Sequence, residues 1–431
     1  MGSLGGGKNS SLLTEAHACM QGFFEVLTVE QVISLLSAFS PLPPEQAALQ
    51  ESDGRVLAED IIATEDLPPT DRAAMDGYAL RAADTFGATE SNPAYLQCVG
   101  NFDIQTPPDR ELQPGQCAGI VTGGILPAGA DAVVMVEYTH DMGAGMVEIR
   151  LPVAPGTHVM LQGEDVRAGE LLLPAGALLR PQEIGLLAAL GKAQIQTRKL
   201  PRVAILSTGD ELVDISATPK PGQVRDVNSS TLACLVRRAG GRPVLLGLSP
   251  DEIHALNAHL RKALKVADLV LLSGGSSVGA RDLTISALQS IQGARILCRG
   301  VALSPGKPLI IADVGGKAVW GLPGQVTSAQ VVMMVLGQAF IRHLQGWKNP
   351  FDQALWPKQK AVLAKNIASR QGREDYVRVR LEQEGTGELL AVPVLGMSGL
   401  LRSLTNSHGL VRIPASLEGL EARRQVDVLL F

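Results

Sequence analysis

The fold is decided by the stretch Val203-Ala204-Ile205-Leu206-Ser207-Thr208-Gly209-Asp210-Glu211-Leu212. Its first four residues are apolar and partly β-branched, which is typical of a buried parallel strand. The run then breaks into Ser, Thr, Gly and two carboxylates, which predicts a strand end at a cleft. Ligands of open α/β sheets bind just beyond the carboxyl ends of the strands. We therefore expect a ligand site at residues 207–212.

Three further glycine-rich segments follow along the chain. A second predicted strand, 267–272, runs into Ser-Gly-Gly-Ser-Ser-Val-Gly at 273–279, and the later segments are 304–308 and 321–324. All four strand exits lie within about 120 residues. Backbone N–H groups in such turns bind anions, so the sequence predicts one phosphate-binding pocket.

Residues 198–345 alternate predicted strands and helices, which favours a doubly wound βαβ domain. Asn228 is the expected cap of the first helix, and Asp251 stands where the dipole of the second favours an anion. The four helices are expected at 228–239, 251–265, 282–291 and 325–345.

Two shorter helices are predicted before this domain. An amphipathic helix at 27–36 has Thr28 as its cap and Gln31 as capping-box partner. A second helix begins at Pro181 and ends before Gly191.

Two regions have the pattern of β structure. Short apolar runs separated by Pro and Gly predict a small β domain at roughly 80–160. The alternation at 376–381 predicts a small C-terminal β-barrel or sheet within 358–431.

The composition argues against several classes of function. The chain has 431 residues, a formal net charge of −5 and 3% aromatic residues, which disfavours a nucleic-acid binder. No apolar run reaches the ~18–20 residues of a membrane span, and residues 1–24 resemble a flexible segment more than a signal peptide. The five cysteines are odd in number and widely spaced, as expected of reduced thiols in a cytoplasmic protein.

Carboxylates are the first candidates for chemistry. Asp210, Glu211 and Asp282 stand at or near strand exits, and Asp76 and Asp165 come from elsewhere in the chain. Any one such residue is more often a cap or part of a solvated turn. Paired carboxylates beside a phosphate pocket indicate Mg²⁺, which prefers carboxylate and substrate oxygens.

Other candidates are weaker when taken alone. Lys307 lies between Gly306 and Pro308, which suits either a surface charge or an oxyanion contact, and the P-loop spacing is absent. The segment from Thr122 to Gly124 is a turn pattern. Three C-terminal residues are equally compatible with an ordinary surface: Arg373, Arg378 and Ser398.

The order of these segments matches a known family. The matching motifs are Met75-Asp76-Gly77-Tyr78-Ala79, Thr122-Gly123 with 127–134, Gly163-Glu164-Asp165, 207–212, 273–279 with Asp282, 305–308 and 321–324. From about residue 27 to 431 the chain resembles the molybdopterin molybdenumtransferases, which are the molybdenum insertases of the MoeA and gephyrin E-domain family.

The resemblance implies a multidomain α/β plus β fold. Its parts would be a discontinuous linker and dimerisation domain (25–62 and 161–197), an inserted β domain (63–160), a MogA-like molybdopterin-binding α/β domain (198–345) and a C-terminal β-barrel domain (346–431).

The implied activity is molybdate insertion into adenylylated molybdopterin, with Mg²⁺-dependent cleavage of the adenylate and release of AMP and molybdenum cofactor. The implied protein is a homodimer whose cleft forms between the βαβ domain of one subunit and the β domain of the other. The implied partners are a molybdopterin adenylyltransferase and client molybdoenzymes, with no nucleic acid and no membrane.

The resemblance also assigns residues by position. Asp282 would be the carboxylate nearest Mg²⁺ and the adenylate phosphate, with Glu211 and Asp251 as further catalytic residues of the βαβ domain. Asp76 would be the catalytic residue of the partner side. The substrate-binding residues would be Thr122, Asp165, Ser277, Lys307, Pro323, Ser328, Arg373 and Ser398.

The chain departs from the family at several cleft positions. Ser304 stands where the family has Lys, Gln325-Val326 replaces Asn-Pro, and Ala73 and Met160 stand where Ser and Arg are common. Losing one preorganised donor can cost ~10²-fold in rate. The departures leave an alternative: a catalytically impaired paralogue that binds or delivers pterin or cofactor, or an enzyme that uses tungstate. A scaffold like the gephyrin E domain in its anchoring role is a third option.

Overall fold

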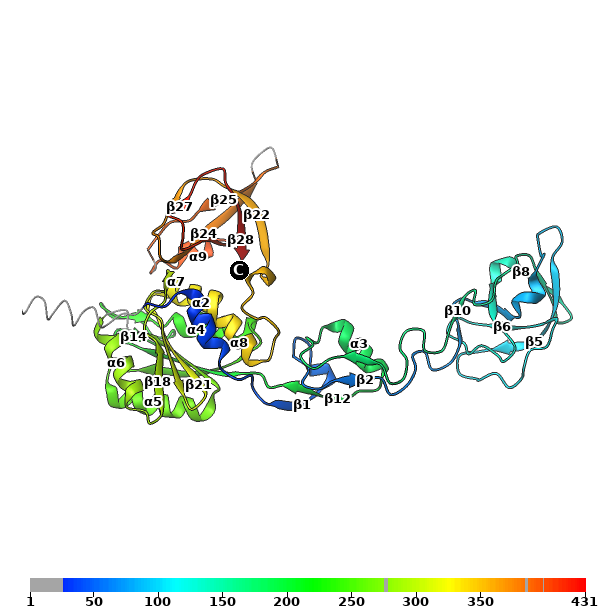
Figure 1. Ribbon diagram of the computed structural model, residues 1–431, viewed down its shortest axis with the longest axis horizontal. Helices are drawn as coiled ribbons and strands as arrows, with labels where there is room; N and C mark the ends of the chain where they lie inside the picture. Colours follow the sequence, from blue (N-terminus) through cyan, green and yellow to red (C-terminus); the bar gives the residue numbers. More distant parts are fainter. Residues whose placement is uncertain (1–25, 275–277, 384–386, 398) are drawn as a thin grey trace, which may run out of the picture. The chain divides into compact units, whose positions relative to one another are not determined.

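The computed structural model describes residues 26–431 apart from 275–277, 384–386 and 398 (Figure 1). The chain forms two compact units. The first unit holds Gly54–Ala58 and Gln196–Phe431 together with the N-terminal residues up to Ala47, and the second unit holds Ala48–Asp53 and Glu59–Ile195.

A six-stranded sheet forms the centre of the first unit, in the order β16-β13-β17-β21-β20-β18. The first four of these strands are parallel, whereas β20 runs antiparallel to β21 and β18 antiparallel to β20. The strands are β13 (Arg202–Thr208), β16 (Arg242–Ser249), β17 (Leu269–Gly274), β18 (Ala294–Cys298), β20 (Ile310–Val314) and β21 (Lys317–Leu322).

Helices cover both faces of this sheet (Figure 1). Val203 and Ile205 of β13 pack into one apolar core with α2, α4, α7 and α8, whereas Ala204 and Leu206 pack into a second core with α5 and α6. The helices are α2 (Val29–Ser37), α4 (Asn228–Arg238), α5 (Ile253–Val266), α6 (Val278–Gln289), α7 (Val326–Val332) and α8 (Gln338–Leu344). The doubly wound βαβ prediction is confirmed.

Three predicted helix boundaries were wrong. The helix expected at 282–291 begins at Val278, so Asp282 lies within it. The helix expected at 251–265 begins at Ile253, after Asp251. The single helix expected at 325–345 is interrupted by a π-helical segment, η4 (Met333–Gly337), which joins α7 to α8. Neither the glycine-rich loop before α6 nor the acidic residue before α5 determines the residue at which the helix begins.

The C-terminal part of the first unit is a closed five-stranded barrel, as predicted. Its order is β24-β25-β22-β28-β26, and pairing of β26 with β24 closes the ring. The strands are β22 (Lys358–Leu363), β24 (Glu374–Gln383), β25 (Leu389–Pro393), β26 (Gly409–Ile413) and β28 (Gln425–Leu430). A short strand before the barrel, β19 (Leu303–Ser304), pairs with β24.

The second unit contains a six-stranded sheet in the order β7-β4-β6-β5-β9-β8, which confirms the small β domain of the predicted fold. Its strands are β4 (Gly77–Leu80), β5 (Ala94–Phe102), β6 (Gln116–Ile120), β7 (Ala132–Met135), β8 (Thr139–Gly143) and β9 (Met146–Ile149).

Paired short strands precede and follow that sheet. β2 (Ile61–Ile62) pairs with β11 (Leu171–Leu173), and β3 (Arg72–Ala73) pairs with β10 (Val159–Met160). β1 (Pro44–Ala48) pairs with β12 (Gln194–Arg198).

Both short helices form where their cap signals predicted. The Thr28 hydroxyl accepts a hydrogen bond from the backbone N–H of Gln31, and Oε1 of Gln31 accepts one from the backbone N–H of Thr28, which completes the capping box at α2. α3 (Pro181–Ala189) has Pro at its first position. Among the described helices, none is both long and apolar enough to cross a membrane.

Candidate functional site

A cavity of about 330 Å³ lies at the carboxyl ends of β13, β17 and β21. It therefore brings together three of the four glycine-rich strand exits. The described residues that line the cavity include none from the fourth strand exit, residues 304–308. The lining residues are Thr208, Glu211, Leu212, Val224, Arg225, Asp226, Val227, Asn228, Ser273, Gly274, Gly324, Gln325, Val326, Gly399 and Leu401.

Glycine is required at position 274 because two strand ends approach closely there. A Cβ atom on Gly274 would lie 2.1 Å from the carbonyl oxygen of Thr208, which is far inside van der Waals contact. A Cβ on Gly209 would in turn meet the Glu211 carboxylate at 2.8 Å. Gly274 therefore lets the ends of β13 and β17 approach closely, and Gly209 leaves room for the Glu211 carboxylate.

Exposed carboxylates lie beside this surface. The hydroxyl of Thr208 donates a hydrogen bond to Oδ1 of Asp251 (2.5 Å), and the backbone N–H of Asp251 donates to Oδ1 of Asp210 (3.1 Å). Asp251 is therefore held at the end of β13, and the expectation that it stands in the first turn of α5 was wrong. Asp210, Glu211 and Asp251 remain exposed to solvent.

The side chain that accepts a hydrogen bond from the first turn of α4 is Asp226, not Asn228 as expected. Oδ1 of Asp226 accepts hydrogen bonds from the backbone N–H of Ser229 (3.0 Å) and from the hydroxyl of Ser207 (3.0 Å). Asp226 is 7% exposed, so its carboxylate ties the start of α4 to the end of β13.

Asn228 instead bridges two neighbouring strand ends. Its side-chain Nδ2 donates to the hydroxyl of Ser273 (2.6 Å) and to the carbonyl of Gly324 (2.9 Å). Its Oδ1 is buried and accepts no hydrogen bond from the described residues. Sequence reasoning missed this role, although the run Arg225-Asp226-Val227-Asn228 puts three polar side chains next to a helix start.

One wall of the cavity comes from the barrel. Gly399 and Leu401 line it, and Arg378 of β24 holds the adjoining segments. The Arg378 guanidinium donates to the carbonyl of Gly396 (2.7 Å) and to the hydroxyl of Ser403 (2.7 Å). Burial lowers the pKa of Arg378 below its usual value. The sequence alone was compatible with an ordinary surface residue, whereas the structure makes Arg378 a cation near the site.

The remaining predicted residues of the first unit lie in several environments. Asp282 is exposed on α6, Lys307 is exposed between β19 and β20, and Pro323 and Ser328 are buried at the end of β21 and on α7. Ser277 and Ser398 lie outside the described residues.

Arg373 is engaged within the barrel. Its Nε lies 3.0 Å from Oδ1 of Asp375, and the Asp375 side chain is 8% exposed. Ser304, where a lysine was expected, pairs in β19 with Asp375 of β24. Neither Arg373 nor Ser304 is among the described residues that line the cavity.

The second unit carries the other three predicted residues. Oδ1 of Asp76 accepts hydrogen bonds from the backbone N–H (2.6 Å) and the hydroxyl (2.7 Å) of Thr122. These bonds lower the pKa of Asp76, the hydroxyl making the larger contribution. Both residues and Asp165 are exposed, as is Met160 on β10.

The described residues fit Mg²⁺ only in combination with a substrate. They include no group of three or more His, Cys, Asp or Glu side chains that could hold a metal ion without other ligands. Mg²⁺ commonly takes one or two carboxylates and completes its shell with phosphate oxygens and water. The exposed Glu211 carboxylate, which lines the cavity, is one donor of that kind.

Comparison with known proteins covers nearly the whole chain. Residues 27–191 match the MoeA N-terminal region (domain I and II), residues 204–343 the probable molybdopterin binding domain, and residues 360–431 the MoeA C-terminal region (domain IV).

Individual relatives agree with these matches. A molybdopterin molybdenumtransferase of Nostoc sp. is 39% identical over 389 residues, which cover 88% of this chain and 87% of the relative. Molybdopterin molybdenumtransferase 2 of Mycobacterium tuberculosis is 35% identical over 392 residues, which cover 89% of this chain and 94% of the relative. The crystal structure of the molybdopterin biosynthesis MoeA protein from Pyrococcus horikoshii OT3 superposes with a TM-score of 0.80 at 31% identity, covering 94% of this chain and 100% of that one.

Proposed function

The chain belongs to the MoeA family of molybdopterin molybdenumtransferases and is a transferase of molybdenum cofactor biosynthesis, and on that premise we propose that it inserts molybdate into adenylylated molybdopterin with release of AMP. The observation that carries this proposal is the cavity at the ends of β13, β17 and β21. It combines strand-exit glycines for a phosphate, the exposed Glu211 carboxylate near a divalent cation, and the buried amide of Asn228.

The backbone at Gly274, which lines the cavity, would hold the phosphate of the pterin through an N–H group. Asn228 fixes the two loops on either side, and its unpartnered Oδ1 can accept a hydrogen bond from a donor of the bound ligand. Arg378, whose charge is only partly solvated, would raise the positive potential of the cavity wall.

Asp282 would be the carboxylate that holds Mg²⁺, with Glu211 and Asp251 as further catalytic carboxylates. Bound Mg²⁺ would neutralise the negative charge that develops on the phosphate oxygens when a phosphoanhydride is cleaved. The chain's own contribution is the position of Asp251 at the end of β13, where the Thr208 hydroxyl donates to its carboxylate and its backbone N–H donates to Asp210.

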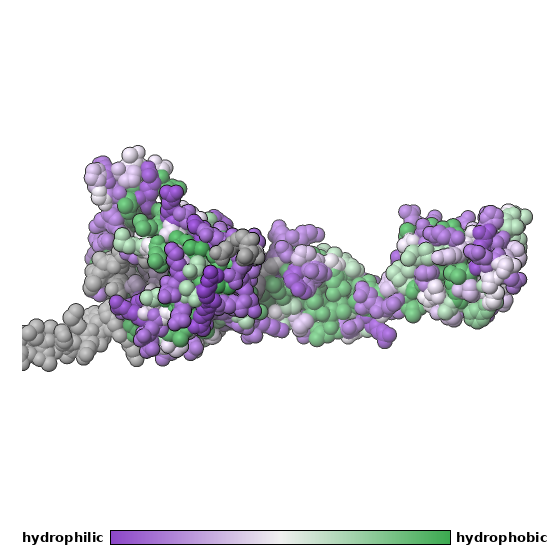
Figure 2. Space-filling view, turned by 90° about the horizontal axis from the view of Figure 1, so that it is seen from above, coloured by the Kyte–Doolittle hydropathy of each residue, from purple (hydrophilic) through white to green (hydrophobic). Residues whose placement is uncertain are grey.

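The partner subunit of a homodimer would contribute Asp76, Thr122 and Asp165. The Asp76–Thr122 pair is preformed, since two hydrogen bonds join them. A surface suited to dimerisation exists in the second unit: apolar side chains gather over α3, β2 and β11 (Figure 2), and the paired residues Ile62 and Leu171 are 54% and 53% exposed. A molybdopterin adenylyltransferase would provide the substrate, and client molybdoenzymes would receive the product.

The test is AMP release from adenylylated molybdopterin in the presence of Mg²⁺ and molybdate. We expect AMP release that depends on both ions, and we expect Asp282→Asn to abolish it while pterin binding is retained. The matched control is Asp109→Asn, since Asp109 is an exposed aspartate of the second unit. Pterin binding without AMP release by the folded wild-type protein would reject the proposal in favour of a cofactor-binding paralogue.

A further inference from the structure

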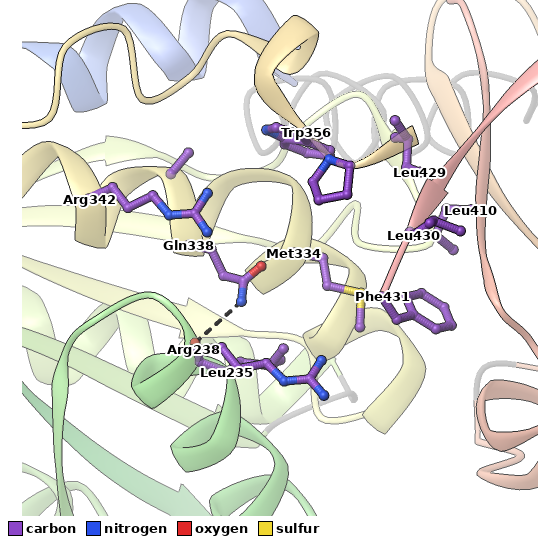
Figure 3. Close-up of a pocket in the computed structure, with 12 residues that line it drawn as sticks. Leu235, Arg238, Met334, Gln338, Arg342, Trp356, Leu410, Leu429, Leu430 and Phe431 are labelled. Atoms are coloured by element: carbon purple, nitrogen blue, oxygen red, sulfur yellow. Dashed lines mark hydrogen bonds between the residues drawn. The ribbon is translucent and has the colours of Figure 1, made fainter. Parts of the chain in front are cut away.

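A second cavity, of about 310 Å³, lies away from the site described above, between the βαβ domain and the barrel. Its walls come from α4, from η4 and α8, from Trp356 and Pro357 after them, and from the barrel strands β26 and β28 (Figure 3). Most lining side chains are apolar. They are Leu235, Met334, Ala339, Trp356, Pro357, Leu410, Leu429, Leu430 and Phe431.

The charged side chains of this cavity have one sign. Arg342 extends from α8 and Arg238 from α4, and the described lining includes no Asp or Glu (Figure 3). Neither guanidinium forms an ion pair with a described residue. The volume is within the range of small-molecule sites, which are mostly apolar with a few polar groups that orient the ligand.

Arg342 is the more constrained of the two cations. Its guanidinium lies 5.2 Å from the centroid of the Trp347 ring, so one of its faces is covered. Burial lowers the pKa of Arg342 below its usual value. A partly desolvated cation without an anionic partner costs free energy, which a bound anion would return.

Gln338 lies one helical turn before Arg342, on the same face of α8. Its Nε2 donates a hydrogen bond of 3.4 Å to the carbonyl of Leu235, the contact that is drawn in Figure 3. This bond turns the amide toward α4.

We propose that this cavity binds a small organic anion with an apolar body, whose acidic group pairs with Arg342 and Arg238 and whose body packs against Trp356 and the leucines of the barrel. The charge of the ligand follows from two guanidinia that pair with no described carboxylate, and its apolar character follows from the walls. The inference does not depend on the AMP-releasing reaction, because none of these residues lines the first cavity.

The probes are 8-anilinonaphthalene-1-sulfonate and N-phenyl-1-naphthylamine, which share one aromatic body and differ in the sulfonate. We expect the full-length protein to enhance the fluorescence of the sulfonate saturably. Its affinity for the sulfonate should be about tenfold or more higher than its affinity for the neutral amine, which is the gain expected from one charge-assisted hydrogen-bonded pair. Equal affinities would overturn the proposal, and so would a failure of the sulfonate to saturate.

The decisive variant is Gln338→Glu. It places a carboxylate four residues before Arg342 on one helix, a favourable ion-pair spacing. We expect weaker sulfonate binding by about tenfold, unchanged amine binding and an unchanged or higher melting temperature. Arg342→Gln should also weaken sulfonate binding, and Arg342→Lys should retain most of it.

Arg261→Gln is the matched control, because Arg261 is an exposed arginine on α5. It should leave both affinities unchanged. If Gln338→Glu left sulfonate binding unaltered, or if Arg261→Gln reduced it as much as Arg342→Gln, the assignment of the anion to this cavity would be wrong.

Discussion

The side-chain amide of Asn228 donates a 2.6 Å hydrogen bond to the hydroxyl of Ser273, and so joins the start of α4 to the end of β17. The same nitrogen also bonds the carbonyl of Gly324 after β21. One side chain therefore sets the spacing of two of the loops that form the cavity.

We predict that Asn228→Ala lowers kcat for AMP release by about 10- to 100-fold, since both loops lose their common tether and small displacements in a preorganised site are costly. The measurement is steady-state AMP release together with thermal unfolding. Asn228 and Ser273 act through one bond, so the double variant with Ser273→Ala should lose much less than the product of the two single losses. Independent effects of the two substitutions would contradict the tethering role.

Ser304→Lys is expected to raise the rate of AMP release. The family resemblance leads us to expect a cation where Ser304 stands. An added positive charge would stabilise the anionic transition state and raise the rate by ~10-fold or more. Ser304→Met is the matched control, because it adds a chain of similar length without the charge. A rate that rises equally in both variants, or in neither, would show that charge at this position does not limit the reaction.

Sequence reasoning succeeded where the signal is contained within a few residues. Thr28 with Gln31, and Pro181 with Gly191, defined two helices because capping bonds span only three or four positions. The apolar run 203–206 identified the central strand, since burial on both faces requires such a run.

The predictions failed where a long-range contact decides the geometry. Asn228 has the residue type of a cap, yet its side chain bonds Ser273 and Gly324, which lie 45 and 96 positions further along the chain. Asp251 is likewise held by Thr208, 43 positions earlier. Arg342 and Trp356 carry no motif at all, and their cavity exists only because the barrel packs against α8.

Ile62→Asp is predicted to shift the proposed homodimer toward the monomer. Ile62 and its strand partner Leu171 are both about half exposed, and a carboxylate buried without a partner in an apolar interface is strongly unfavourable. Sedimentation-velocity measurements over a concentration series would show the shift. Phe86→Asp is the control, as Phe86 is a 66% exposed aromatic residue of the inserted β domain, and equal effects of the two substitutions would count against the surface.

The pH dependence of stability should include a contribution from Glu183 at the start of α3. Hydrogen bonds from Arg180 lower the pKa of Glu183 from 4.5 to about 2. Because the pKa is depressed in the folded state, the stabilisation is present above pH 4.5 and is lost as the pH falls from there toward 2.

Glu183→Gln, which keeps the capping bond but not the charge, should therefore destabilise by ~0.5 kcal/mol at pH 6 and by less at pH 3.5. Urea unfolding at the two pH values measures the difference. A cost that stayed constant with pH would exclude the charge as its source.

The two-stranded ladder of β3 and β10 places Ala73 opposite Val159, so the polypeptide enters and leaves the inserted β domain through adjacent points. A module attached in this way can be exchanged as a cassette: replacing residues 74–158 with a short hairpin turn would leave the remaining path of the backbone continuous. The six-stranded sheet of the first unit and the barrel should then still fold. Asp76 and Thr122 would be removed together in this single deletion.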